Sequence, residues 1–249
     1  MSERRGWPHP RRLYAPELPP SEQEDFELIE ESRKHVSVLR LRSGDELELF
    51  DGTGHTALAT LLTVSAKRMS CRVAPRQYRA PEAPALHVVL GMPKGDKLDT
   101  AVRMLTELGA ASIHIAQTER AIPKGSDMQT RLARLERISR EACAQSGQAY
   151  APVLHAPASL SAIAARAETG SLKWVLWEES ATPRPRHGSS GSDPMWVLVG
   201  PEGGLAPHEV DALREQGFVE LSLGASILRF ETAVVVAATL ALDHLQRLR

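Results

Sequence analysis

The 249-residue sequence has few cysteines, no long apolar run and no apolar leader. Its two cysteines, Cys71 and Cys143, lack CxxC or Cys/His spacing, which excludes a disulfide framework and predicts no metal site. The apolar run 233–242 is far shorter than the ~20 residues that span a bilayer. Residues 1–20 lack the apolar core of a signal peptide. These absences predict a soluble, cytoplasmic protein.

The net charge of the sequence is also close to zero. The sequence has 30 Lys and Arg residues against 31 Asp and Glu, which leaves −1. This sum excludes binding of nucleic acid by bulk positive charge, but it is compatible with a local basic patch. Only six of the cations are lysines, so 24 are arginines. The excess reflects either genome composition or sites that need a planar guanidinium for phosphate or base edges.

The first 85 residues predict an arm, a small β-barrel and a linker. Residues 1–20 are rich in proline and arginine, and 74–85 is a proline-rich linker. The stretch between them reads mostly as short strands bounded by turn signals; these strands are expected at 46–50, 55–62 and 69–73. A helix is expected over 21–39, because Ser21 and Glu24 have the spacing of a capping box.

From residue 86 onward, short apolar strands alternate with helices, which predicts an α/β domain with a mostly parallel sheet. The expected strands are 86–92, 112–116, 153–155, 172–177, 196–199 and 219–223. The expected helices are 96–108, 129–146, 159–168, 207–216 and 231–248. The last segment begins with β-branched residues, but its apolar positions continue at helical spacing to Leu248, so we predict a helix. Residues 180–194 form a polar loop.

The sequence GPEGG at 200–204 lies between an expected strand and a helix start at Pro207. Glycines at such a turn permit positive φ and let a ligand approach the backbone closely. No GKS or GKT follows and the spacing is not GxGxxG, so the turn is not a phosphate loop. The residues alone leave two interpretations, a plain loop and a ligand-binding turn.

A second strand-to-helix turn has the sequence LGASILRFETA at 223–233. Arg229 stands where the last helix begins, and a cation gains nothing from the helix dipole there. Either Arg229 forms a salt bridge with Glu202 or Glu231, or its guanidinium is directed at a substrate.

These two turns, about twenty residues apart, resemble the paired C-terminal motifs of the RsmE-type methyltransferases of the SPOUT superfamily. Further motifs of that family occur in order along nearly the whole chain. They are Arg12-Leu13-Tyr14, His35 with Val38-Leu39-Arg40, Gly44-Asp45, Phe50-Asp51-Gly52, Lys94-Gly95-Asp96-Lys97, Glu107-Leu108-Gly109, Thr118-Glu119-Arg120 and the segment 141–147. Two positions depart from the family pattern. His35 lies one residue closer to Val38, and Gln148 stands where an arginine is usual.

The resemblance implies an N-terminal PUA-like barrel (1–73), a linker (74–85) and a C-terminal SPOUT methyltransferase domain (86–249) with a deep trefoil knot. It also implies S-adenosyl-L-methionine as the cofactor, bound in the knot. Glycines where the backbone must approach a ligand and aliphatic residues where adenine must be covered agree with this expectation. The positions that match the cofactor-binding motifs are Leu176, Val199, Gly200, Gly203, Leu221, Leu223, Gly224 and Leu228.

The activity that the resemblance implies is methylation of N3 of a uridine in 16S ribosomal RNA. Loss of the N3 proton places negative charge on the uracil oxygens, and a fixed arginine would stabilise that charge. Arg229 is our candidate for this role, and Glu202 and Glu231 are candidates for the proton acceptor. Either glutamate could instead orient Arg229 or cap a helix.

RNA binding is expected at cations of the arm, the barrel and the catalytic domain. The candidates are Arg11, Arg12, Arg40, Lys94 and Arg120. Arg131, Arg134, Arg137 and Arg140 fan over about half of a helix, so they form no single stripe. Arg120 or Arg140 could replace the arginine that is missing at Gln148.

We therefore predict a cytoplasmic, homodimeric 16S ribosomal RNA methyltransferase whose partner is the RNA or the small ribosomal subunit. Two alternatives remain: a SPOUT enzyme that acts on another RNA position or atom, and a non-catalytic RNA-binding assembly factor.

Overall fold

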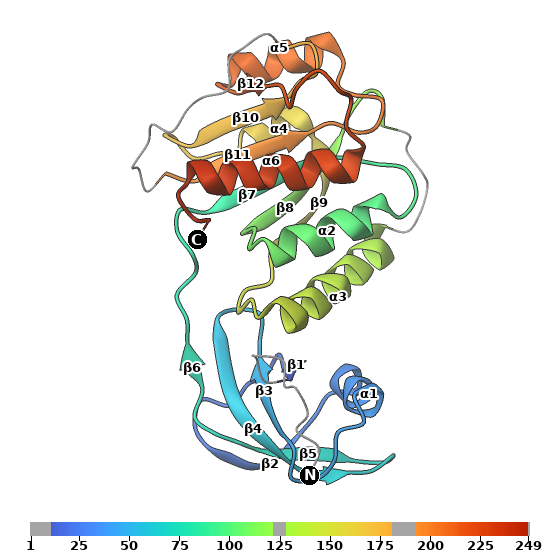
Figure 1. The fold of residues 1–249 in the computed structure, drawn as a ribbon, viewed down its shortest axis with the longest axis vertical. Helices are drawn as coiled ribbons and strands as arrows, with labels where there is room; N and C mark the ends of the chain where they lie inside the picture. The colour runs from blue at the N-terminus through green and yellow to red at the C-terminus, as the bar shows by residue number, and fades with distance from the viewer. Residues whose placement is uncertain (1–10, 122–127, 181–192, 249) are drawn as a thin grey trace. The chain divides into compact units, whose positions relative to one another are not determined.

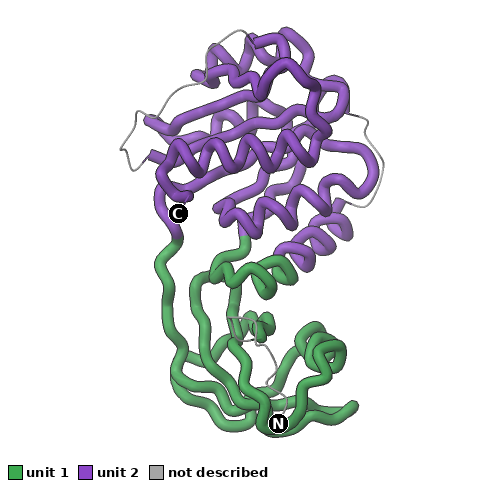
Figure 2. Tube along the Cα trace, viewed as in Figure 1, with its two compact units in different colours: residues 1–81, 140–151 green, residues 82–139, 152–249 purple. Residues whose placement is uncertain are grey.

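A computed structural model describes residues 11–121, 128–180 and 193–248 (Figure 1). The chain divides into two compact units (Figure 2). Unit 1 holds the described residues up to Pro81 together with Arg140–Ala151, and unit 2 holds Glu82–Ser139 and the residues from Pro152 onward. The chain therefore passes between the units three times, whereas the sequence motifs predicted a single linker. The polar loop expected at 180–194 lies mostly outside the described residues.

Unit 1 is a six-stranded sheet with one helix. Its order is β1-β3-β4-β5-β2, and β6 pairs with β4. The elements are β1 (Arg12–Tyr14), β2 (Gln23–Glu27), α1 (Glu30–Val38), β3 (Glu46–Phe50), β4 (His55–Val64), β5 (Met69–Val73) and β6 (Gln77–Tyr78). Leu47 and Leu49 of β3 are fully buried, as their alternation with glutamates predicts. The strands expected at 46–50 and 69–73 are confirmed.

The expected helix over 21–39 is wrong in its first half. Residues Gln23–Glu27 form β2, which pairs with β5, and the helix begins only at Glu30. Glu24 reaches across the strands to Arg72 instead of capping a helix. Cross-strand pairing therefore overrides the local capping-box spacing.

Unit 2 is a three-layer α/β domain. All six strands are parallel, in the order β12-β10-β11-β7-β8-β9. The strands are β7 (Leu86–Gly91), β8 (Ser112–Gln117), β9 (Val153–Ser159), β10 (Leu172–Leu176), β11 (Met195–Val199) and β12 (Val219–Leu221). The helices are α2 (Lys97–Glu107), α3 (Met128–Ser146), α4 (Leu160–Ala164), α5 (Pro207–Glu215) and α6 (Phe230–His244). The predicted parallel sheet is confirmed.

The two faces of this sheet carry separate helix layers (Figure 1). Helices α2 and α6 pack on one face, with Val88, Leu105 and Val234 in its core. Helices α4 and α5 cover the other face around Val89 and Leu198. The C-terminal segment, which was ambiguous in sequence, is the helix α6. Its small residues Ala237, Ala238 and Ala241 allow close packing on the sheet.

Both cysteines are free and buried. Burial raises the pKa of Cys71 and of Cys143 to about 12, so both thiols stay protonated and unreactive near neutral pH.

Candidate functional site

A pocket opens at the carboxyl ends of the three neighbouring strands β10, β11 and β12. These strands end at Leu176, Val199 and Leu221, and all three residues line the pocket. The pocket and the open space at its mouth together measure about 720 Å³. The carboxyl edge of a parallel sheet is also where ligands bind in open α/β folds.

The turn at 200–204 forms one wall of this pocket, and close contacts favour glycine both within the turn and at the strand end that packs against it. A Cβ atom on Gly91, at the end of β7, would lie 2.5 Å from Pro201 Cδ. Gly204 has φ +70°, and a Cβ there would lie 2.9 Å from Glu178 Oε1. Only glycine fits both positions without a shift of the neighbouring chain. The turn is therefore a tightly packed element of the pocket wall.

Glu202 ties this turn to the segment between β7 and α2. Its carboxylate lies 2.9 Å from Lys97 Nζ and accepts the Lys94 backbone N–H at 3.1 Å. Burial favours a higher pKa for Glu202, but these hydrogen bonds outweigh it and hold the pKa below its ordinary value. Glu202 is thus an ionised, fully engaged carboxylate near neutral pH.

The turn that follows β12 forms the opposite wall. Gly224 has φ +113°, and Leu223 and Leu228 both line the pocket. Ile227 also lines it, although 92% of its surface is exposed. An aliphatic residue so exposed at a pocket rim is available to cover a ligand.

Arg229 directly precedes α6 in extended conformation, and its side chain is exposed. It does not line the pocket itself, but its chain neighbours Leu228 and Phe230 do. Among the described residues it forms no hydrogen bond or ion pair. Glu202, one of its two expected salt-bridge partners, is held by Lys97 instead. The guanidinium of Arg229 is therefore available to a bound substrate.

Glu231 lies in the first turn of α6, between the pocket-lining residues Phe230 and Ala233. Its Oε2 is buried and has no hydrogen-bond partner among the described residues. A carboxylate at a helix N-terminus is favoured by the dipole, yet this oxygen still lacks a donor.

Seven of the eight cofactor residues suggested by the motifs surround this one pocket. They are Leu176, Val199, Gly200, Leu221, Leu223, Gly224 and Leu228. Gly203 does not line it; its carbonyl accepts a hydrogen bond from Arg120 at 3.0 Å. Sequence analysis did not single out Glu178, Ser222 or Ser226, which add polar groups to the lining. Glu178 directly follows the strand expected at 172–177, and this position is the signal that could have found it. Ser222 lies within the strand expected at 219–223, which in the structure ends at Leu221.

Four of the five cations proposed for RNA binding are exposed. Lys94 and Arg120 contact the 200–204 turn, one through Glu202 and the other through Gly203. Arg11 and Arg40 are exposed in unit 1, with Arg11 at 3.8 Å from Asp45.

The prediction that Arg12 binds RNA must be corrected, because the Arg12 side chain is only 2% exposed. It forms an ion pair with Glu48 at 2.6 Å and donates hydrogen bonds to the carbonyls of Cys143 and Gln148 at 2.7 and 2.9 Å. Its guanidinium also lies over the Phe50 ring at 4.6 Å. Arg12 is therefore a structural residue of unit 1, and it is too deeply buried to contact a phosphate.

The arginines of α3 are occupied as well. Arg134 pairs with Asp99 in unit 2, and Arg140 pairs with Glu31 at 3.1 Å and lies over the Tyr14 ring in unit 1. Arg140 is therefore a poor substitute for the arginine that Gln148 replaces, whereas Arg120 is exposed.

The following holds for residues 11–121, 128–180 and 193–248. There, no cluster of three or more His, Cys, Asp or Glu residues is arranged to hold a metal ion. No helix within the same ranges is long and apolar enough to cross a membrane.

Unit 2 is thus a parallel α/β domain with a pocket between two glycine-containing turns, carried on one chain with a small unit built on a six-stranded sheet. An RNA methyltransferase domain family matches residues 81–242, and an RNA methyltransferase PUA domain family matches residues 28–74. The chain belongs to this RNA methyltransferase family.

Individual relatives agree with this placement. The chain is 31% identical over 208 residues to ribosomal RNA small subunit methyltransferase E of Mycobacterium bovis, which covers 81% of this chain and 79% of that protein. It is 31% identical over 218 residues to the Bacillus subtilis protein of the same name, covering 84% and 85%. The crystal structure of the Neisseria gonorrhoeae enzyme of that name, bound to S-adenosyl methionine, matches with a TM-score of 0.85 at 28% identity, covering 94% and 98%. The family resemblance drawn from the motifs is confirmed.

Proposed function

We propose that this protein transfers a methyl group from S-adenosyl-L-methionine to N3 of a uridine in 16S ribosomal RNA. The observation that carries the proposal is the pocket between the 200–204 turn and the turn after β12, which combines aliphatic walls with close-packed glycines. The relatives named small-subunit ribosomal RNA methyltransferases, one of them solved with the cofactor, support the same activity.

The pocket residues fit this cofactor chemically. Leu176, Leu223 and Leu228 offer apolar cover for a flat base, and the exposed backbone of Gly200 offers hydrogen-bonding groups. Glu178 adds a carboxylate, which suits a ligand that carries positive charge. When bound, the cofactor supplies an already activated methyl group, so the protein needs only to position the uridine and favour loss of its N3 proton.

Within this proposal, Arg229 stabilises the negative charge that develops on the uracil oxygens, since its side chain is exposed next to two pocket-lining residues and has no partner among the described residues. Glu231 is the better-suited proton acceptor, because its Oε2 has no donor among the described residues. Glu202 is a positioning residue: Lys97 and the Lys94 N–H already occupy it, and it joins the turn to the start of α2.

A deep trefoil knot at the carboxyl end of the sheet is part of the proposal, as is a cytoplasmic location. So is a homodimer. Apolar α6 residues Val235, Val236 and Leu240 are only partly buried, and the neighbouring turn exposes Ile227. Sedimentation of the full chain at micromolar concentration should give twice the monomer mass, and a monomer would contradict the dimer.

Calorimetry with S-adenosyl-L-methionine separates this enzyme from the alternative of a non-catalytic RNA-binding assembly factor. We expect one saturable site, with affinity lost in the variant Gly200→Val. The valine side chain would meet Leu205, because a Cβ atom at position 200 would lie 3.1 Å from Leu205 Cγ. Absence of cofactor binding by the unaltered protein would overturn the proposed function.

A further inference from the structure

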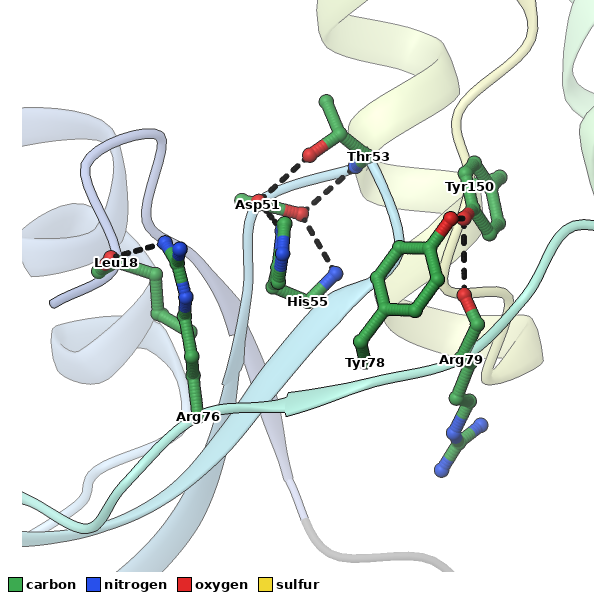
Figure 3. Close-up of polar contacts among 8 residues, drawn as sticks. All are labelled: Leu18, Asp51, Thr53, His55, Arg76, Tyr78, Arg79 and Tyr150. Carbon is green, nitrogen blue, oxygen red and sulfur yellow. Dashed lines mark hydrogen bonds and ion pairs between the residues drawn. The ribbon is translucent and has the colours of Figure 1, made fainter. Parts of the chain in front are cut away.

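Unit 1 carries a surface cluster of aromatic side chains that the cofactor site does not use (Figure 3). Tyr78 of β6 is 61% exposed, and its ring centroid lies 5.2 Å from that of His55. The hydroxyls of Tyr78 and Tyr150 are 2.9 Å apart. We refer to His55, Tyr78 and Tyr150 as the aromatic patch.

Hydrogen bonds hold the aromatic patch in place. The Tyr150 hydroxyl lies 2.9 Å from the Arg79 carbonyl, which can only accept, so Tyr150 donates to Arg79 and Tyr78 donates to Tyr150. The His55 Nδ1 lies 2.8 Å from an Asp51 carboxylate oxygen. With the Tyr78 hydroxyl engaged internally, its exposed surface is mainly the ring. A fixed, exposed ring can stack on a flat ligand at little entropic cost.

The charges around the aromatic patch favour an anionic ligand. Burial opposes ionisation of Asp51, but the hydrogen bonds from Thr53 and His55 outweigh it and lower its pKa, so its charge is satisfied internally. Burial raises the pKa of Tyr150 to about 12, so this hydroxyl adds no negative charge near neutral pH.

Two arginines lie close to Tyr78 in the chain, at positions 76 and 79. The Arg79 side chain is 57% exposed, and it forms an ion pair of 3.7 Å with Glu48. Arg76 is exposed and donates to the Leu18 carbonyl at 3.2 Å, with no carboxylate partner among the described residues.

We propose that the aromatic patch, with Arg76 and Arg79, binds an unpaired nucleotide of single-stranded RNA. The base stacks on Tyr78, and the adjoining phosphates contact the two arginines. Exposed aromatic rings beside cations are the usual means of holding unstacked bases. The residues beside Tyr78 are Gln77 and the arginines, not the aliphatic residues that the core of a protein interface would add. This inference rests on the proposed function only in taking RNA as the substrate.

Binding of a fluorescein-labelled single-stranded oligouridylate of about ten nucleotides to the full chain tests the proposal directly. Tyr78→Ala should weaken binding roughly 5- to 100-fold, the usual loss when one stacking partner is removed. Tyr78→Phe keeps the ring and should bind within about twofold of the unaltered protein. Arg79→Gln should lower the slope of log K against log salt by roughly 0.7, because one phosphate contact is lost, and Tyr78→Ala should leave that slope unchanged.

Leu58→Ala is the matched control, since Leu58 is 62% exposed in the same sheet but outside the patch, and it should bind like the unaltered chain. Equal affinity of Tyr78→Ala and the unaltered protein would overturn the proposal. Calorimetry of the same proteins with S-adenosyl-L-methionine keeps the two claims distinct. If the protein binds the cofactor and Tyr78→Ala leaves RNA affinity unchanged, only the proposal for the aromatic patch is overturned. If the unaltered protein does not bind the cofactor, the proposed function is overturned.

Discussion

Two arginines of this protein have opposite environments, although both belong to motifs of the same family. Arg12 is buried in unit 1 and occupied by three acceptors, whereas Arg229 is exposed next to two pocket-lining residues, with no partner among the described residues. Substitution of the first should therefore affect stability, and substitution of the second should affect turnover.

Arg229→Ala should lower kcat by roughly 10²–10³, which is the usual effect of removing one donor to a developing oxyanion. Affinity for S-adenosyl-L-methionine should stay within about twofold, because Arg229 is not among the residues that line the cofactor pocket. Single-turnover kinetics on small ribosomal subunits, with calorimetry on the cofactor, measure both quantities. Arg229→Lys keeps the charge but loses the planar fork, so an intermediate rate is expected. Wild-type turnover in Arg229→Ala would remove Arg229 from the mechanism.

Arg12→Met should lower the free energy of unfolding by about 3 kcal/mol, because the largely buried Glu48 would keep only the more distant Arg79, at 3.7 Å, as an ion-pair partner. Urea unfolding followed by circular dichroism measures the change. Arg11→Met is the control: Arg11 is 41% exposed and 3.8 Å from Asp45, so its loss should cost less than about 0.5 kcal/mol. Equal stability of the two variants would contradict a structural role for Arg12.

At the scale of secondary-structure elements, the turn after β11 depends on its contact with the end of β7. Gly91→Ala would place a methyl group 2.5 Å from Pro201 Cδ, so one of the two segments must move. We expect a loss of about 1–3 kcal/mol in unfolding free energy and weaker cofactor binding. Gly217→Asn is the control, because Gly217 has open space around it and Asn tolerates its φ of +85°. Unchanged cofactor affinity in Gly91→Ala would show that the turn does not shape the site.

Neighbouring strands of the same sheet also hold a stack of rings away from the pocket. The His114 and His155 ring centroids are 4.1 Å apart, and Trp196 lies 4.8 Å from His114. Ser112 Oγ lies 2.9 Å from His114 Nε2 and 2.7 Å from His87 Nδ1. The charged groups that face His114 are Arg166, at 3.4 Å, and Glu168. Burial first, and then the neighbouring cationic groups, lowers the pKa of His114 to about 3.

This depressed pKa makes the stability of unit 2 sensitive to acid. The unfolded chain binds a proton at His114 below about pH 6.5, and the folded chain does so only near pH 3. Unfolding free energy should therefore fall by up to about 1.4 kcal/mol per pH unit as the pH drops from 6.5 towards 3. His87 and His155, whose pKa values are also lowered by burial, add to the slope.

Urea unfolding between pH 7 and pH 4 tests this assignment. His114→Asn removes the titrating ring and keeps a polar side chain, so its stability should depend less steeply on pH than that of the unaltered protein. Identical slopes for the two proteins would contradict the assignment of the acid sensitivity to His114.

At the scale of the whole molecule, sequence patterns predict the elements better than their long-range partners. The parallel sheet follows from alternating apolar strands and helices, and the pocket follows from two glycine turns after neighbouring strands. Nothing local indicates that Gln23–Glu27 pairs with β5, or that Arg140–Ala151 belongs to unit 1. The burial of Arg12 likewise depends on carbonyls more than one hundred positions away in sequence. Such contacts arise from the tertiary fold and leave no periodic signal.

The central claim is that the cofactor pocket of unit 2 serves N3 methylation of a uridine in 16S ribosomal RNA. Mass-spectrometric nucleoside mapping of ribosomal RNA from cells that lack this protein tests it most directly. We predict that a 3-methyluridine disappears from the 16S RNA and returns when the unaltered gene is restored, but not when Arg229→Ala is supplied. Persistence of every 3-methyluridine in the cells that lack the protein would contradict the account.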